Sequence, residues 1–123
     1  MKLFALDATN GKILWLFDPY DGDYTSHGTG VNRGLNYYRG SNGDRILYAT
    51  FSNLYAIDPK NGKLINSFGN DGVVDLKKGL DRKVDNLLLA ANTPGVIYDD
   101  LLILGHRLLR VQEQSLVILE LLM

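Results

Sequence analysis

The alternation of apolar and polar positions along the chain predicts short strands joined by tight turns. LFAL (3–6) and ILWLF (13–17) flank the polar stretch DATNGK and are typical of the two strands of a hairpin. RILYATF (45–51) predicts a further strand after the turn-like segment GSNGD, and GVIYDDLLILG (95–105) predicts two strands on either side of a turn at its paired aspartates. We therefore expect an all-β body of antiparallel sheets in series.

One motif occurs twice, and this repeat is the most informative feature of the pattern. LFALDATNGKILWLF (3–17) aligns without a gap with LYAIDPKNGKLINSF (54–68), and similarity at a fixed period is the signature of an array of like units. In each copy the Asp is expected to cap the turn with its carboxylate, and the Asn-Gly pair to supply the two positive φ angles of a tight hairpin turn. A strand over 64–68 is expected to follow the second turn.

Two stretches depart from this pattern. Residues 75–92 mix charges with leucines, but Gly79 interrupts them, which favours an irregular connection leading into a strand. Residues 106–123 contain no glycine or proline, and their leucine-rich pattern suits an amphipathic helix. The chain is thus divided into a β-rich body over 1–105 and a tail of different character over 106–123.

Composition narrows the class of protein without assigning a function. The chain of 123 residues has a formal net charge of -1, which argues against a nucleic-acid or membrane-surface binder because such proteins show a basic bias. It has no cysteine, so neither a disulfide framework nor a thiolate metal site is expected. No targeting signal opens the sequence, and no segment reaches the apolar length of a membrane span.

ALDATNGKILW (5–15) has the form AxDxxNGxxxW and resembles the tryptophan-docking motif of quinoprotein dehydrogenases, which use pyrroloquinoline quinone (PQQ). The resemblance implies a fragment, about two blades long, of an eight-bladed β-propeller with four-stranded antiparallel blades. It also implies that Trp15 packs against a neighbouring blade instead of stacking on the cofactor. Asn66 occupies the tryptophan position of the second copy, so the packing there is expected to differ.

A longer match points to one branch of the family. VNRGLNYY (31–38), FGNDGVVDL (68–76) and NTPGVIYDDLLILG (92–105) are similar to the N-terminal blades of the membrane-associated quinoprotein glucose dehydrogenases. This resemblance, over about residues 2–105, implies a periplasmic enzyme, its parent anchored to the inner membrane. Such an enzyme oxidises glucose or a related aldose or polyol to the lactone or ketone. Its electrons pass from PQQ to a quinone, and Ca²⁺ bound outside this chain assists.

Four residues are candidates for contact with PQQ under this resemblance. Arg33 matches the arginine that binds a PQQ carboxylate in the family, for which a guanidinium fork is suited; otherwise it is a surface arginine before a strand. Thr93 lies where relatives place a threonine that hydrogen-bonds PQQ, or is a turn residue before proline. His27 is either the loop histidine of sugar-oxidising relatives or an exposed histidine. Asn32 is expected to support the arginine or to shape the turn.

No catalytic residue and no metal ligand is assigned in this chain. The resemblance ends at Gly105, and the family's calcium ligands and catalytic aspartate belong to later blades, so the isolated chain is expected to be inactive. Asp99 and Asp100 are expected to form a solvated turn and not a metal site. Codons compatible with 106–123, read one nucleotide back, permit a glycine-rich continuation like that of the family. A frameshift is therefore our hypothesis for the tail, and sequencing the DNA tests it.

A non-catalytic propeller that scaffolds protein contacts is the alternative function. The repeats by themselves would satisfy it. The VNRG and TPGVIY segments (31–34 and 93–98) discriminate between a PQQ-dependent enzyme and a scaffold. A scaffold does not need an arginine that binds a carboxylate.

Overall fold

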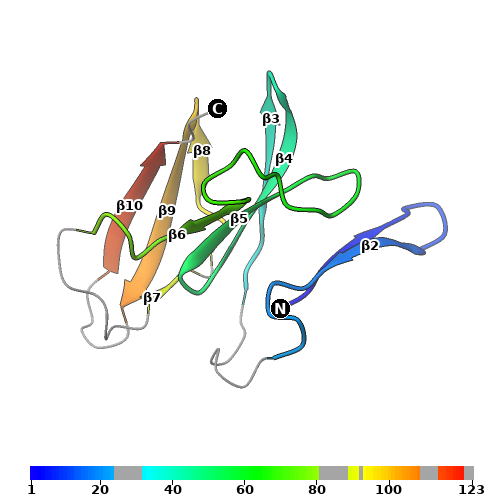
Figure 1. The fold of residues 1–123 in the computed structure, drawn as a ribbon, viewed down its shortest axis with the longest axis horizontal. Coiled ribbons are helices and arrows are strands. Elements are labelled where there is room, and N and C mark those ends of the chain that lie inside the picture. Colours follow the sequence, from blue (N-terminus) through cyan, green and yellow to red (C-terminus); the bar gives the residue numbers. More distant parts are fainter. Residues whose placement is uncertain (24–31, 81–88, 92, 109–113, 121–123) are drawn as a thin grey trace.

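The structure is a computed structural model that describes residues 1–23, 32–80, 89–91, 93–108 and 114–120, with the backbone alone for 106–108 and 114–120. These residues form three antiparallel sheets and no helix (Figure 1). The all-β prediction is therefore confirmed. Within the same residues there is also no helix that could cross a membrane.

The three sheets follow one another along the chain. The first sheet pairs β1 (Leu3–Leu6) with β2 (Ile13–Phe17). The central sheet has the order β3-β4-β5-β6, formed by β3 (Asn36–Gly40), β4 (Gly43–Thr50), β5 (Asn53–Ile57) and β6 (Val73–Asp75). The third sheet has the order β10-β9-β7, with β8 also paired to β9; its strands are β7 (Leu89–Ala90), β8 (Val96–Tyr98), β9 (Leu101–Leu108) and β10 (Gln114–Glu120).

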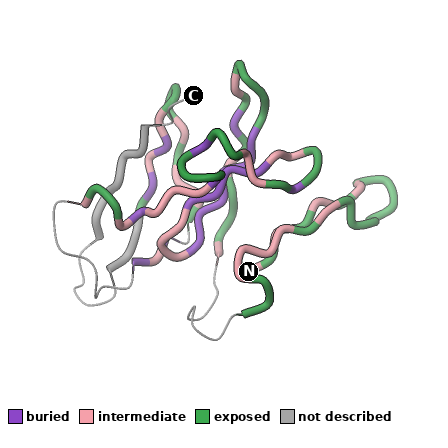
Figure 2. Tube along the Cα trace, in the orientation of Figure 1, coloured by how far each residue is buried: buried purple, intermediate pink, exposed green. Residues whose placement is uncertain are grey.

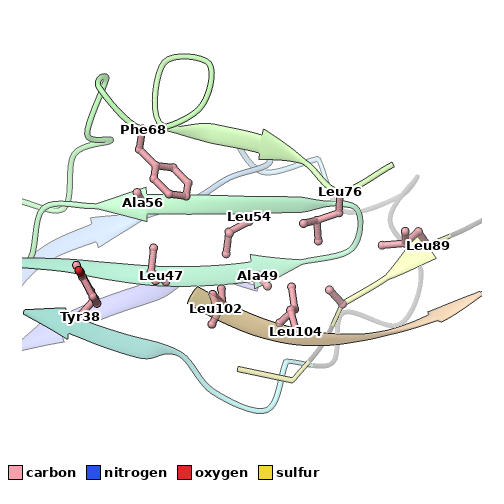
Figure 3. Packing of buried hydrophobic residues seen from close by; sticks show 11 residues of the cluster. Tyr38, Leu47, Ala49, Leu54, Ala56, Phe68, Leu76, Leu89, Leu102 and Leu104 are labelled. Atoms are coloured by element: carbon pink, nitrogen blue, oxygen red, sulfur yellow. The ribbon is translucent and has the colours of Figure 1, made fainter. Parts of the chain in front are cut away.

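The central sheet is covered on both faces. Consecutive residues of β4 are buried from Arg45 to Thr50, and because successive side chains of a strand point to opposite faces, both faces must be in contact with other elements. The larger core lies between the central and third sheets (Figure 3). Its buried members are Tyr38, Leu47, Ala49, Leu54, Ala56, Phe68, Leu76, Leu89, Ala91, Leu102 and Leu104.

The opposite face of the central sheet receives the first sheet. Leu3, Trp15 and Phe17 pack there against a smaller buried cluster, and the rings of Phe17 and Tyr55 meet edge to face with centroids 5.4 Å apart. The alternate residues, such as Phe4 and Leu16, are exposed. Exposed and half-buried positions both occur along this hairpin (Figure 2). The first sheet thus has one covered and one open apolar face.

Trp15 joins the first repeat to the second. Its indole Nε1 donates to the carbonyl oxygen of Pro59 at 2.9 Å, and a methyl group placed on Gly62 would lie 2.6 Å from the ring. The indole therefore rests directly on the turn of the second repeat. The prediction that Trp15 packs between units is confirmed.

The turns of the two repeats have the same construction. In the first, the Asp7 carboxylate accepts the backbone N–H of Thr9 at 2.8 Å, as predicted, and Asp58 accepts that of Lys60 at 2.8 Å. The expectation of two positive φ angles is wrong: Gly11 has φ 73°, whereas Asn10 does not have a positive φ. The Asn side chain instead accepts the N–H of Lys12 at 2.9 Å. The turn is a four-residue loop and needs one left-handed residue.

The strand predicted over 64–68 is not formed. Leu64 makes a single bridge to Ile57, after which the chain turns away and buries Phe68, which is 4% exposed, in the larger core. The edge of β5 is taken by β6, whose pairing runs from Asn53↔Asp75 to Tyr55↔Val73. The prediction failed because β6 occupies this edge and Phe68 is buried in the larger core, which redirects the chain.

The tail is also different from the prediction. Residues 106–108 continue β9, and Gln114–Glu120 forms β10 in register with it from Gln114↔Arg107 to Glu120↔Leu101. The predicted amphipathic helix is therefore wrong over these residues. The long edge of β9 offers a row of unpaired N–H and C=O groups, and pairing with them outweighs a leucine-rich helical pattern. The strand expected at the end of 75–92 is β7, while 81–88 and 92 lie outside the described residues.

Three tyrosines, one half-buried and two buried, make the stability of the fold sensitive to alkali. Burial raises the pKa of Tyr20 to about 12, and its hydroxyl lies 2.8 Å from Thr50 Oγ1. Burial also raises the pKa of Tyr48 and Tyr55. Because the folded pKa values exceed those of the unfolded chain, the stabilisation is complete below about pH 10 and declines as pH rises toward the folded values.

We therefore expect the urea midpoint of unfolding to be constant up to about pH 9.5 and to fall between about pH 10 and 12. Tyr20→Phe should make this decline shallower, and Tyr98→Phe, at an exposed position, is the matched control. A midpoint that rises over this range, or the same slope for Tyr20→Phe as for the wild type, would contradict the assignment.

Candidate functional site

Two loops from distant parts of the sequence meet at the candidate site. Residues 32–35 lead into β3, and residues 93–95 lead into β8, which lies beside β3 (Figure 1). A methyl group placed on Gly34 would be 3.5 Å from Pro94 Cγ. Gly34 of the first loop thus faces the proline ring of the second, and the structure brings Arg33 and Thr93 onto adjoining loops.

Arg33 is exposed at the tip of the first loop. Over the ranges 1–23, 32–80, 89–91 and 93–105, no carboxylate forms an ion pair with its guanidinium. A guanidinium carries up to five N–H donors in a planar fork and cannot be deprotonated in proteins. The loop therefore presents an available cation suited to a carboxylate.

Asn32 fixes the backbone on both sides of Arg33. Its Nδ2 donates to the carbonyl oxygen of Ala49 in β4 at 2.6 Å, and its Oδ1 accepts the N–H of Gly34 at 2.8 Å. The second bond closes an Asx-type turn in which Arg33 is the central residue. The expectation that Asn32 shapes this turn is confirmed, and contact of Asn32 with a cofactor stays a prediction.

Thr93 is exposed at the start of the second loop. The loop is held from two sides. The carbonyl oxygen of Pro94 accepts a hydrogen bond from Asn36 Nδ2, and Gly95, at φ 76°, lies so close to β9 that a methyl group there would overlap the carbonyl oxygen of Ile103. The position of Thr93 is therefore determined by contacts with both the central and the third sheet.

Asn36 was missed by the sequence reasoning. A signal was present, since asparagine is depleted in strands and here it occupies the first position of β3. Its partner is 58 positions away along the chain, so spacing could not reveal the contact. His27, the remaining candidate, falls in 24–31 and lies outside the described residues.

The turn between β8 and β9 is a structural contact. Asp99 is in the turn with φ 50°, and Asp100 Oδ1 accepts a hydrogen bond from the Tyr38 hydroxyl at 2.6 Å. This bond to a carboxylate raises the pKa of the Tyr38 phenol, and the Arg45 guanidinium lies over the same ring, 5.9 Å from its centroid. In the part of the chain that the structure describes, no group of three His, Asp or Glu side chains gathers as it would around a metal ion.

The sequence is similar to a family of known propeller domains. The family model described as "PQQ: Glucose/ethanol/alcohol dehydrogenase, beta-propeller domain" matches residues 1–116. No solved structure shows a significant match to the chain.

Several curated proteins are relatives. The dehydrogenase subunit of the quinone alcohol dehydrogenase of Acetobacter aceti is 35% identical over 98 residues, which are 64% of this chain and 13% of the relative. The quinoprotein glucose dehydrogenase of Escherichia coli K12 is 30% identical over 117 residues, 85% of this chain and 14% of the relative. The glycerol dehydrogenase large subunit of Gluconobacter oxydans 621H is 26% identical over 120 residues, which are 91% of this chain and 16% of the relative. The chain thus spans 13% to 16% of the length of these relatives.

Proposed function

This chain belongs to the family of PQQ-dependent dehydrogenase β-propeller domains, as a fragment of a couple of blades, and from that premise we propose that its two adjoining loops bind a carboxylate of PQQ. The observation that carries the proposal is the exposed Arg33, which forms no ion pair with the described side chains. It lies on a loop that Asn32 shapes and that rests against the loop of Thr93. The alternative, a scaffold without a cofactor, gives no reason for this arrangement.

The residues present suit the group. PQQ is a flat molecule with three carboxylates, so a planar guanidinium at Arg33 can bind one of them through two parallel hydrogen bonds. The hydroxyl of Thr93 can donate a further hydrogen bond. When bound, PQQ supplies the two-electron oxidation chemistry, and the protein's part is to bind and orient it.

The substrate and acceptor belong to the same proposal. The relatives are named as alcohol, glucose and glycerol dehydrogenases, and we propose glucose or a related aldose or polyol because VNRGLNYY and NTPGVIYDDLLILG resemble the sugar-oxidising branch. A quinone as electron acceptor is proposed from the name of the quinone alcohol dehydrogenase relative. The proposal also includes Ca²⁺ held by ligands outside this chain, a periplasmic location, and a parent protein associated with the membrane.

Titration of the chain with PQQ, followed by calorimetry, tests the carboxylate site. We expect saturable binding, and Arg33→Ala should weaken it by about tenfold to a hundredfold, since a hydrogen bond to a charged group contributes about 1.5–3 kcal/mol. Arg33→Lys should be intermediate because the charge stays and the planar fork is lost.

Arg39→Ala is the matched control, because Arg39 is also exposed and lies further along β3; it should bind PQQ as the wild type does. The same loss of affinity in both alanine variants would show that Arg33 contributes only through nonspecific charge attraction. A wild-type chain that does not bind PQQ would overturn the proposal.

A further inference from the structure

The loop of Thr93 is tied to β3 at two points. Asn36 Nδ2 donates to the carbonyl oxygen of Pro94, two residues before β8 begins at Val96. The Tyr38 hydroxyl donates to Asp100, in the turn that follows β8, at 2.6 Å. Asn36 and Tyr38 are two positions apart in one strand, so their side chains point to the same side of it. The side chains of β3 therefore hold the short strand β8 at both of its ends.

The tie at Pro94 is the one next to the candidate site. Asn36 follows the Arg33 loop at the start of β3, and Pro94 follows Thr93. Between them, a methyl group placed on Gly34 would be in van der Waals contact with the proline ring. The hydrogen bond thus links the backbone of one loop to the strand that continues the other.

A side chain makes this hydrogen bond because no backbone ladder joins the two loops at Pro94. β3 is an edge strand of the central sheet, with the order β3-β4-β5-β6, and the two loops belong to different sheets. Pro94 has no N–H, so its loop cannot complete a backbone ladder at this residue. The amide side chain of Asn36, on the edge strand, donates to the Pro94 carbonyl oxygen and so connects the two loops.

We propose that Asn36 is a positioning residue of the cofactor site, which holds the Thr93–Gly95 loop against the Arg33 loop so that both can bind one carboxylate ligand. This inference rests on the proposed function. It extends that function to a residue that does not itself touch the ligand, and it makes the affinity for PQQ depend on a contact between two sheets.

The test uses two neutral variants of the full chain. Asn36→Ala removes the amide, and Asn36→Thr removes it while introducing a residue that strands favour, so that a failure to fold does not explain a common result. Asn42→Ala, at the exposed turn between β3 and β4, is the control. Two quantities are measured in each: the dissociation constant for PQQ, and the nuclear Overhauser effect between the Gly34 Hα protons and the Pro94 ring.

In the wild type and in Asn42→Ala we expect this effect to be observed. In both Asn36 variants it should be lost or strongly reduced, with PQQ binding weakened about fivefold to tenfold, as expected for one neutral hydrogen bond. Arg33→Ala should weaken binding while the Gly34–Pro94 effect persists, because its backbone contact is untouched.

If the nuclear Overhauser effect between Gly34 and Pro94 persists in the Asn36 variants, the Asn36 hydrogen bond does not hold the two loops together. An effect that is lost without any change in PQQ affinity overturns the positioning role. A wild-type chain that binds no PQQ overturns the cofactor proposal, and the Gly34–Pro94 comparison still upholds or overturns the tie independently of it.

Discussion

Gly62→Ala is expected to destabilise the chain by about 3 kcal/mol, because two costs are added at one position. Gly62 has φ 72°, a left-handed conformation that an L-residue adopts at a cost. Its new methyl group would also lie 2.6 Å from the indole of Trp15, and either the ring or the turn would have to move. Since Trp15 is bonded to Pro59 on the same turn, the movement would separate the first sheet from the central one. Urea unfolding of both chains measures the difference.

Gly11→Ala is the matched control for this prediction. Gly11 occupies the same position of the first repeat with φ 73°, and no described atom lies within 4 Å of a methyl group placed there. Gly11→Ala should lower the free energy of unfolding by about 1–2 kcal/mol, because only the cost of the left-handed conformation is added there. The excess at Gly62 is then the contribution of the Trp15 contact, and it should shrink when Gly62→Ala is measured in a Trp15→Ala background. Equal losses at the two glycines would show that the indole does not rest on the turn.

Gly95→Ala is expected to have an effect of similar size, about 3 kcal/mol, and to reach the candidate site as well. A methyl group at Gly95, where φ is 76°, would overlap the carbonyl oxygen of Ile103 and lie 3.2 Å from Leu104 Cδ1. Ile103 belongs to β9, which pairs with both β8 and β10, so the strand cannot yield. The loop must move instead and carry Thr93 away from Arg33. We expect lower stability in urea and weaker binding of PQQ.

Gly79→Ala controls for the backbone conformation. Gly79 has φ 85°, and the structure places no described atom within 4 Å of a methyl group there. Gly79→Ala should lose only the stability that a left-handed backbone conformation costs an L-residue, and its affinity for PQQ should be unchanged. If Gly95→Ala lowered stability without changing the affinity, the second loop would not be part of the site.

Sequence reasoning succeeded where the interactions are local. Asp7 and Thr9 are two positions apart, and their bond forms in any chain that makes this turn. The hairpin of β8 and β9 was also predicted correctly, because alternation and a turn at Asp99 are sufficient to specify it. The docking role of Trp15 was reached through the family motif, and its partners Pro59 and Gly62 agree with it.

The failures concern competition for sheet edges. Residues 64–68 align with β2, yet β6 takes the edge of β5, because Phe68 is buried in the larger core and redirects the chain. Residues 114–120 have a helical pattern of leucines, yet they pair with β9. In both cases the outcome depends on which distant strand has unpaired backbone groups, and a pattern within one segment does not contain that information.

By itself, the sequence determined the all-β class, the repeat with its Asp-capped turns, and the family with its candidate arginine. Each of these rests on contacts within a few residues or on a motif that is contiguous in the chain. The tertiary structure decided which strands share a sheet, and that Asn36 ties the loop of Thr93 to that of Arg33 across 58 positions. The physical reason is that burial and backbone pairing are satisfied by whichever segments the fold brings together, irrespective of their distance along the chain.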